Sequence, residues 1–600
     1  MTAKGPTSLS RSTQFFFIAG VLTVGFLFVL IRLSVIQWLQ HGKWNLLAKG
    51  QHERTLLDHV DRGIVYDRNR KVLAINVDVP SLYAVSDKIQ HPKKTAKQLA
   101  PYLNSSQRAL VAKFNREKDF VWLARKIDPD RLAKINRLEL PGIGVLMESK
   151  RFYPKRALFG HLVGFVGVDN NGLEGVEHRY DELLKGKKGG IVVVRDAHGK
   201  SIYPKGFNYI PPSQGESLVL TVDETIQHIS TREVRRAVEK TGAKGGIALV
   251  MNPANGEILA MAVYPFFNPN TVGSYQPAQW RNRAITDIYE PGSTFKIVTA
   301  AAALEEKMVS PQEIINCEAG TFVVSGTIIH DHEPMGSVPF NEVVAKSSNI
   351  GMIKVASRLG KNRLEAYSRA FGFGSRLGID LTGESPGLLR SVPSWSDRSL
   401  ASIAIGQEIG VTALQMISAT AVIANNGYPV TPHVMLAATA REEDMPKPAP
   451  HSPPIRSALS GGIGGTETPL DENQSGNKRR IVSAETAKAL TQILEQVVTA
   501  GTGKKAGIFG FRVAGKTGTA QKIDPGTGSY SKEGYVSSFV GFVPADKPAL
   551  VILVMIDEPV GERTGGEVAA PVFSEIGRET LRYLKVAPDV FIGKAAVPTA

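Results

Sequence analysis

The chain has 600 residues, of which 42% are hydrophobic and 21% are charged, a composition that excludes a chain disordered throughout. The formal net charge of +15 indicates anionic surroundings, such as lipid head groups, an acidic polymer or nucleic acid. No lysine-rich arm and no basic tract with interleaved aromatic residues occurs, so we expect no nucleic-acid partner.

The first predicted element is a membrane anchor. Between Arg11 and Arg32 the sequence "STQFFFIAGVLTVGFLFVLI" carries no charge over twenty residues, and a helix of that length spans about 30 Å, the thickness of the hydrocarbon core. A cleaved signal peptide would have a shorter apolar run and small residues at a cleavage site, whereas bulky residues follow here. We therefore predict a tail over 1–14 and an uncleaved transmembrane helix over 15–36. Basic residues flank both ends, so charge does not fix the orientation.

The next predicted region, 37–215, mixes strands and charged helices. "DRGIVYDRNRKVLAINV" has the pattern of a strand, a turn and a second strand, and "KKTAKQLAPYLNSSQRALVAKF" has helical spacing. "PPSQGES" at 211–217 is typical of a boundary. These patterns predict a separate α+β domain.

The pattern changes over 216–585. "GGIALVMNPANGEILAMAVY" predicts a hairpin, "TFKIVTAAAALEEK" a helix, and "YVSSFVGFVPADKPALVILVMID" two further strands. We predict an α+β domain in which helices flank an antiparallel sheet. Residues 442–478 are rich in Pro, Gly and Ser, and we expect a disordered surface insertion there, with a C-terminal tail over 586–600.

One motif matches a phosphate-binding loop. "GFRVAGKTGTA" contains Gly510, Gly515, Lys516 and Thr517 at the spacing of G-x-x-x-x-G-K-[ST]. Such a loop needs a strand before the first glycine and a helix from the lysine onwards. Here the strand pattern lies between the glycines and no helical period follows, so we reject nucleotide binding.

A second motif predicts a nucleophile. Ser293 in "YEPGSTFKIVTA" follows Pro-Gly at a predicted helix start, and Lys296 lies on the same face one turn later. A serine hydroxyl needs a nearby base to become reactive, and a helix N-terminus favours developing negative charge. Ser-x-x-Lys also occurs at Ser475 and Ser529, so the pattern alone is weak.

Two further motifs, and their order along the chain, strengthen the prediction that Ser293 is a nucleophile. Ser347-Ser348-Asn349 lies between the helical runs "FNEVVAK" and "IGMIKVASRL", and Lys516-Thr517-Gly518-Thr519 lies on a predicted strand. Another Lys-Thr-Gly, at 240–242, is explained as a helix end. Ser-x-x-Lys, Ser-x-Asn and Lys-Thr-Gly on helix, loop and strand are the pattern of the penicilloyl serine transferases.

These motifs and their surroundings resemble the class B penicillin-binding proteins, and among them the septal cell-division D,D-transpeptidases of the penicillin-binding protein 3 type. Arg62-Gly63 and Asp67-Arg68 resemble the signature that follows the family's anchor, and "RFYPKRALFGHLVGFVGVDNNGLEGVEHRYDELLKGKKG" at 151–189 resembles the division enzymes. "RNRAITDIYEPGSTFK" and "SIAIGQEIGVTALQM" resemble the stretches around their nucleophile. Arg70 stands where the family has a turn glycine, so the resemblance predicts the chemistry of the site but not the geometry of this turn.

The resemblance implies the penicilloyl-serine-transferase fold over 216–585, standing on an elongated α+β pedestal of the dimerisation type over 37–215. It also implies the roles of the site residues. The catalytic residues would be the nucleophile Ser293, its base Lys296, the proton relay Ser347 and the electrostatic support Lys516. Asn349, Thr517, Gly518 and Thr519 would bind the peptide and its carboxylate, and the N–H groups of Ser293 and Thr519 would form the oxyanion hole.

By the same resemblance, the enzyme would cross-link peptidoglycan stem peptides through a serine ester, and β-lactams would mimic the donor. It would need no metal, nucleotide or other cofactor. Residues after about 36 would lie outside the cytoplasmic membrane, at the septum. The partners implied are the membrane and division proteins, including an integral-membrane glycosyltransferase.

Three alternatives stay open: an elongation-type class B transpeptidase, a penicillin-recognising sensor, and a scaffold without transpeptidase activity. The histidines of "HDHE" at 330–333 could be metal ligands, but no other cluster supports them, and we expect solvated or hydrogen-bonded side chains there. Cys317 is the only cysteine, which excludes an internal disulfide, and we expect it to be buried.

Overall fold

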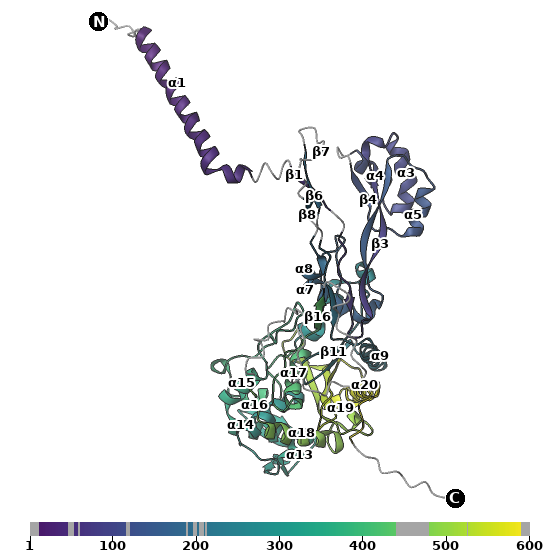
Figure 1. Cartoon of the computed structure of the whole chain (residues 1–600). Coiled ribbons are helices and arrows are strands. Elements are labelled where there is room, and N and C mark those ends of the chain that lie inside the picture. The colour runs from purple at the N-terminus through teal and green to yellow at the C-terminus, as the bar shows by residue number, and fades with distance from the viewer. Residues whose placement is uncertain are drawn as a thin grey trace, which may run out of the picture. The chain divides into compact units, whose positions relative to one another are not determined.

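The computed structural model describes residues 11–45, 53–57, 60–115, 120–187, 190–195, 201–202, 209–210, 213–439, 479–524 and 526–589 (Figure 1). The chain divides into two compact units, residues 1–60 with 186–214 and residues 61–185 with 215–600. The insertion predicted over 442–478 lies outside the described residues, as do 1–10 of the predicted first tail and 590–600 of the last.

The first unit contains the predicted anchor. Helix α1 (Arg11–Ser34) continues as a turn of π-helix over Val35–Leu39. Within the described residues, Phe15–Leu39 is the one stretch of helix that is long and apolar enough to cross a membrane. The unit also holds a small antiparallel sheet, in which β6 (Gly190–Arg195) pairs with three strands: β1 (Glu53–Leu57), β7 (Ser201–Ile202) and β8 (Tyr209–Ile210).

The second unit begins with the sheet of the predicted pedestal. Its strand order is β16-β9-β2-β3-β4, and β5 also pairs with β3. Helices α3, α4 and α5 pack their apolar faces with β3 and β4 into a separate core. The strands are β2 (Val65–Tyr66), β3 (Val72–Ala84), β4 (Val121–Ala124), β5 (Ile143–Phe152), β9 (Ser217–Leu220) and β16 (Met435–Thr439). The helices are α3 (Pro92–Leu103), α4 (Gln107–Phe114), α5 (Pro129–Asn136), α6 (Gly160–Val163), α7 (Gly175–Arg179) and α8 (Asp181–Lys185).

The turn between β2 and β3 forms with Arg70 at the position where the resemblance led us to expect a glycine. Arg70 has φ +63°, the left-handed conformation that glycine adopts most easily. The buried carboxylate of Asp67 accepts hydrogen bonds at 2.8 Å from the backbone N–H groups of Asn69 and Lys71. These two bonds hold the turn in place, so Arg70 adopts the left-handed conformation at a cost in backbone strain of about 1 kcal/mol.

A buried ion cluster lies near the start of the second unit. Arg62 and Arg151 each donate from Nε to Glu177 at 2.6 Å, and the three side chains are at most 2% exposed. Arg62 also pairs with Asp181 at 2.6 Å. Burial alone would lower the pKa of Arg62, but the two carboxylates outweigh it and leave the pKa raised. This cluster, which we call the pedestal ion cluster, joins segments more than a hundred residues apart.

The second half of the unit is built on an antiparallel sheet, as the sequence predicts, and the sheet has five strands in the order β11-β10-β19-β18-β17. Along β10, Ile247 and Leu249 contribute to the core on one face, whereas Ala248 and Val250 contribute to the core on the other. Both faces are therefore buried, which explains why these strands are almost uniformly apolar. The strands are β10 (Gly245–Met251), β11 (Ile258–Tyr264), β17 (Ala514–Ile523), β18 (Tyr530–Val543) and β19 (Leu550–Asp557).

Helices cover both faces of this sheet. Helices α9 and α20 pack on one face, and α17, whose twelve residues are all buried, packs on the other with α12 and α18 (Figure 1). The larger helices are α9 (Glu224–Thr241), α12 (Lys296–Glu305), α13 (Phe340–Ala345), α14 (Asn349–Leu359), α15 (Lys361–Ala370), α16 (Ser399–Ala404), α17 (Ala413–Ala424), α18 (Ala484–Thr499) and α20 (Ala570–Tyr583). Short pieces are α10 (Pro277–Trp280), α11 (Arg283–Thr286), η5 (Gly292–Phe295), α19 (Gly565–Val568), β12 (Ile314–Asn316), β13 (Thr321–Val324), β14 (Thr327–His330) and β15 (Ser337–Pro339).

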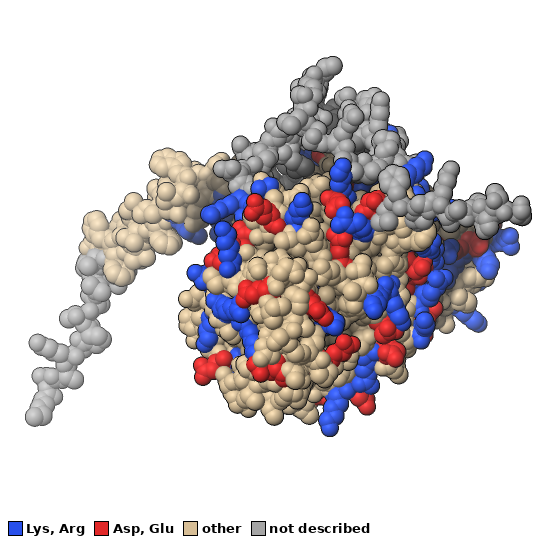
Figure 2. Space-filling view, turned by 90° about the horizontal axis from the view of Figure 1, so that it is seen from below, with Lys and Arg blue, Asp and Glu red and all other residues tan. Residues whose placement is uncertain are grey.

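The positive net charge is not gathered in one patch on the face that Figure 2 shows. Lysine and arginine side chains alternate there with aspartate and glutamate. A nucleic-acid interface needs basic side chains gathered along one surface, so this face does not have the charge pattern of such an interface.

Candidate active site

Ser293 lies in the tight turn η5 that leads into α12. A backbone hydrogen bond fixes the turn, because the N–H of Gly292 donates to the carbonyl oxygen of Gly406 at 3.0 Å. Ser293 itself is partly exposed, whereas Lys296, three residues on, is fully buried. The predicted helix start is confirmed. Ser293 lies in the turn η5, and Lys296 is the first residue of α12, which follows directly.

The amine of Lys296 contacts the predicted Ser-x-Asn loop. Its Nζ donates to the carbonyl oxygen of Ser347 and to Oδ1 of Asn349, each at 2.8 Å, and lies 3.3 Å from Oγ of Ser347. Burial lowers the pKa of Lys296 to about 7, although the nearby charge of Asp331 opposes the shift. Near neutral pH a large share of this amine is therefore uncharged and able to accept a proton.

Asp331 holds the loop in place. Its Oδ2 accepts from Oγ of Ser348 at 2.6 Å, and its Oδ1 accepts from the N–H groups of Asn349 at 2.5 Å and Ile350 at 3.1 Å. A carboxylate at the N-terminus of α14 satisfies free N–H groups and favours the helix dipole. This role could not be predicted from the sequence, because the letters "HDHE" carry no signal for a helix that begins eighteen residues later.

Strand β17 supplies the third segment. Lys516 is fully buried, and Oγ1 of Thr517 lies 2.6 Å from Oγ1 of Thr502, a neighbour that no sequence motif indicates. Oγ1 of the exposed Thr519 accepts from the N–H of Gly565 at 3.0 Å. Burial, and then the charge of Lys296, lower the pKa of Lys516 well below its usual value. The strand continues to Ile523 with no helix after the lysine, which confirms that this motif is no phosphate-binding loop.

Gly518 lets strand β17 and the turn that holds Ser293 approach one another. A Cβ atom on Gly518 would lie 2.4 Å from Oγ of Ser538, 2.8 Å from a side-chain carbon of Thr294 and 3.0 Å from the carbonyl oxygen of Pro291. No side chain fits between β17 and the serine turn. Since β17 is also the edge strand of its sheet, its outer backbone groups have no neighbouring strand in the described part of the chain.

The structure thus brings the eight predicted site residues into one region. Lys296 joins the serine helix to the Ser-x-Asn loop, and Gly518 places β17 against the serine turn. Within the described residues, neither Lys296 nor Lys516 forms an ion pair with a carboxylate, and no group of three His, Cys, Asp or Glu side chains could hold a metal ion. We call Ser293, Lys296, Ser347, Asn349 and residues 516–519 the serine site.

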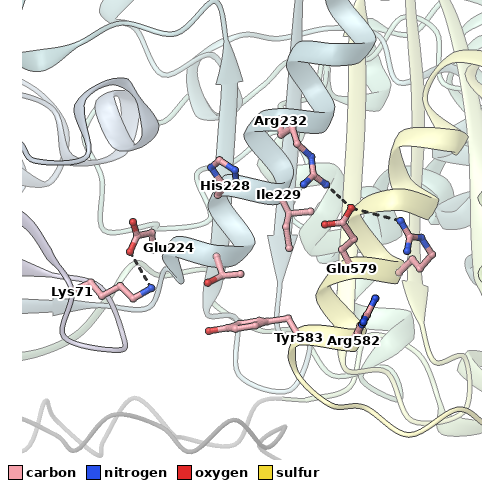
Figure 3. A pocket seen from close by; sticks show the side chains of 10 residues that line it. Lys71, Glu224, His228, Ile229, Arg232, Glu579, Arg582 and Tyr583 are labelled. Atoms are coloured by element: carbon pink, nitrogen blue, oxygen red, sulfur yellow. Dashed lines mark hydrogen bonds and ion pairs between the residues drawn. The ribbon is translucent and has the colours of Figure 1, made fainter.

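A cavity lies away from these residues, between α9, α20 and the turn after β2 (Figure 3). It has a volume of about 720 Å³ and is lined by charged side chains. Lys71 pairs with Glu224 at 3.1 Å, and Arg232 pairs with Glu579 at 2.5 Å. Most of its charges are thus compensated, and none of its lining residues belongs to the serine site.

Comparison with known proteins identifies the family. Residues 246–578 match the Penicillin binding protein transpeptidase domain, and residues 58–220 match the Penicillin-binding Protein dimerisation domain. The chain belongs to the class B penicillin-binding proteins. Relatives in Pseudomonas aeruginosa and Escherichia coli are named as probable or established peptidoglycan D,D-transpeptidases, and with its matching transpeptidase domain this chain is such an enzyme.

Relatives of this class B penicillin-binding protein are similar along nearly the whole chain. It is 37% identical to the Stage V sporulation protein D of Bacillus subtilis over 97% of its own length and 87% of that protein. It is 31% identical to the peptidoglycan D,D-transpeptidase FtsI of Escherichia coli, covering 96% and 93% of the two chains. The crystal structure of penicillin-binding protein 3 of Mycobacterium tuberculosis with aztreonam has a TM-score of 0.64, 28% identity, and coverage of 89% and 98%. The transpeptidase fold and the family predicted from the sequence are both confirmed.

Proposed function

We propose that Ser293 is the residue acylated by the donor stem peptide and that Lys296 is its general base. The proposal rests on the buried amine of Lys296, whose pKa is lowered to about 7. Lys296 follows Ser293 by one helical turn, and its amine contacts Ser347 and Asn349. An amine of this kind can take the serine proton at neutral pH, which an ordinary lysine cannot.

The proposed reaction has two halves. Oγ of Ser293 attacks the carbonyl carbon of the penultimate D-alanine while Lys296 accepts the hydroxyl proton. The tetrahedral oxyanion is held by the N–H groups of Ser293 and Thr519, and its collapse releases the terminal D-alanine, which receives the proton through Ser347. An amine of a second stem peptide then attacks the ester, forms the cross-link and restores the serine.

Substrate recognition follows from β17. The terminal carboxylate of the donor is anionic, and its charge would favour the protonated form of Lys516, which with the hydroxyls of Thr517 and Thr519 would donate hydrogen bonds to it. Gly518 gives the strand its close approach to the serine turn, and the free strand edge can pair with an extended peptide, while Asn349 holds the peptide from the other side. β-Lactams would enter the same site as mimics of the donor.

We further propose that α1 anchors the enzyme in the cytoplasmic membrane, with residues after about 36 on the outer side, and that it acts at the division septum. The similarity to FtsI supports the septal role, as does the stretch 151–189. In that role it would work beside other division proteins, including an integral-membrane glycosyltransferase that supplies new strands.

The first experiment is covalent labelling of the full-length protein by a fluorescent penicillin. The wild type and the Ser475→Ala variant, which loses another Ser-x-x-Lys pattern of the chain, should be labelled equally. The Ser293→Ala variant should carry no label. Strong labelling of Ser293→Ala would refute the assignment of the nucleophile.

The second experiment locates a fluorescent fusion of the protein in growing cells. Enrichment at midcell during constriction is the expected result. Signal along the lateral wall without midcell enrichment would instead assign the enzyme to elongation, and signal confined to sporulating cells would assign it a role like that named for the Bacillus relative.

A further inference from the structure

The cavity between α9 and α20, which we call the helix cavity, is lined by more basic than acidic side chains (Figure 3). One wall is a face of α9 and the other is a face of α20, because the lining residues of each helix recur at intervals of three and four positions. The turn after β2 closes one end. The basic side chains are Lys71, Arg232, Arg578 and Arg582, and the acidic ones are Glu224 and Glu579.

The first of these acids, Glu579, is shared between two guanidinium groups. It lies 2.5 Å from Nη2 of Arg232 and 3.6 Å from Nη2 of Arg578. Each arginine has one further acid, Glu233 for the first and Glu575 for the second. The hydrogen bond to Glu575 raises the pKa of Arg578, and the charge of Arg232 opposes that shift. The two guanidinium groups are therefore close enough to repel one another.

The second acid, Glu224, is shared in the same way. It pairs with Lys71 at 3.1 Å and with Lys155 at 2.6 Å. Burial alone would raise the pKa of Glu224, but the two lysines outweigh it and leave the pKa lowered. Both acids that line the helix cavity are thus already occupied, and neither compensates a further cation.

Arg582 is that further cation. It follows Arg578 by one turn on the same face of α20. Among the residues that the structure describes, no carboxylate lies within ion-pair distance of Arg582 and no acceptor bonds to its guanidinium, while Arg578 uses Nη2 alone. The end of α20 favours positive charge, but its last carbonyl oxygens bond to backbone N–H groups. Two planar, fork-shaped donors therefore line the cavity with unused N–H groups.

The arrangement of these donors indicates the kind of anion that fits. A carboxylate offers two oxygens in one plane, whereas a phosphate offers at least three oxygens and up to two negative charges. Donors that come from neighbouring turns of a helix and from the opposite wall match the phosphate better. The volume of about 720 Å³ is that of a small-molecule site and exceeds one phosphate group. The remaining space, beside Ile229 and Tyr583, would hold the group that carries the phosphate.

We propose that the helix cavity binds a phosphate group carried by a larger molecule, with Arg578 and Arg582 as the main donors. Lys71 belongs to the matched dimerisation domain and Arg578 to the matched transpeptidase domain, so the ligand would connect the two. The site lies apart from the serine site, and its occupancy does not depend on the proposed acyl transfer.

The test measures binding of inorganic pyrophosphate to the full-length protein in detergent, by isothermal titration calorimetry at constant ionic strength. We expect saturable binding at one site, and a rise in melting temperature of about 2 °C at saturating ligand. Competition with a glycerol phosphate oligomer separates two sources of the phosphate. Tighter binding of the oligomer indicates a phosphodiester polymer, and tighter binding of pyrophosphate indicates a terminal phosphate.

Variants locate the binding in the helix cavity. Arg578→Gln and Arg582→Gln should each weaken it about tenfold, the effect of losing one charge-assisted contact. Glu579→Gln removes a competing acid and should strengthen it about threefold. Arg235→Gln removes an exposed arginine of α9 outside the cavity and should keep the wild-type affinity. Labelling by fluorescent penicillin should be the same in all four variants, which shows that they are folded.

Three outcomes would overturn the site. One is the absence of saturable binding of both phosphate probes, and another is equal affinity of Arg582→Gln and Arg235→Gln for them. The third is binding of a hexaglutamate peptide but of neither phosphate probe, which would show that the cavity receives an acidic segment of a protein. None of these results bears on the proposed acyl transfer, which labelling of Ser293 tests separately.

Discussion

The molecule buries two groups of charges and treats them in opposite ways. In the pedestal ion cluster, the carboxylate of Glu177 lies 2.6 Å from the Nε atoms of both Arg62 and Arg151. In the serine site, Lys296 and Lys516 are just as inaccessible, but within the described part of the chain neither has an ion-pair partner. The cost of removing a charge from water is similar in both places, and only the first group is compensated.

The pKa values show the result. The carboxylates around Arg62 overcome the effect of burial and raise its pKa, whereas burial lowers the pKa of Lys296 to about 7. A paired charge keeps its proton and can serve as a structural contact. An unpaired buried amine gives up its proton near neutral pH, which is what a general base requires. The comparison teaches that pairing, and not burial, separates structural from chemical charges here.

The largest expected effect comes from removing the unpaired amine. Lys296→Ala should lower the rate of penicillin acylation by about 10³-fold, because Ser293 loses its base. The protein should remain folded, since the change removes a group that is costly to bury. Stopped-flow acylation and a thermal melt of the same sample measure both quantities.

Lys488→Ala, which removes an exposed lysine on α18, is the matched control and should acylate at the wild-type rate. Normal acylation by Lys296→Ala would remove the role assigned to this amine. Lys296→Arg should fail as well, because a guanidinium stays protonated at any working pH.

Removing Glu177, the acid that both arginines of the pedestal ion cluster share, should have the opposite effect: it should lower stability and have no direct effect on acylation. Glu177→Gln leaves two buried arginines with less compensation, and we expect the free energy of unfolding to fall by about 3–5 kcal/mol. Denaturant titration followed by fluorescence measures it. The exposed Glu182 on the next helix is the control, and Glu182→Gln should change stability by less than about 0.5 kcal/mol. A loss of acylation with unchanged stability would contradict a structural role.

The pH dependence of acylation tests the lowered pKa. Below about pH 7 Lys296 is protonated and has no lone pair for the serine proton; above it the amine is free. The acylation rate should therefore rise about tenfold between pH 6 and pH 8 and then level off. A profile that keeps rising to pH 10 would indicate an ordinary lysine.

The smallest effect concerns Asp331. Its charge raises the pKa of Lys296, so Asp331→Asn should move the midpoint of that profile to lower pH, by less than about one unit. The asparagine keeps part of the hydrogen bonding to the start of α14. A midpoint that moved upwards would show that Asp331 does not act on Lys296 through its charge.

Local patterns in the sequence were enough for the elements that depend on neighbouring residues. The uncharged run of α1, the apolar, β-rich runs of β10 and β11, and the spacing of Ser293 and Lys296 each have their physical cause within a few residues. The meeting of the serine turn with β17 could be inferred only through the resemblance to a family, because the two segments are more than two hundred residues apart.

Contacts between distant segments remained beyond the sequence. Nothing in the letters around Asp331 or Thr502 indicates that the first caps α14 and the second contacts Thr517. Such roles depend on which side chains the folded chain places together, and one sequence does not encode that in a readable motif.

The tight contact at Gly518 has a consequence for inhibitor escape. Any side chain at this position would meet Ser538 and Thr294 and push the strand away from the nucleophile. Such a change would exclude the drug and the natural substrate together, so a bacterium gains nothing from it. Mutations that confer resistance must arise elsewhere around the site, at positions where a side chain can change in size or charge while β17 keeps its contact with the serine turn.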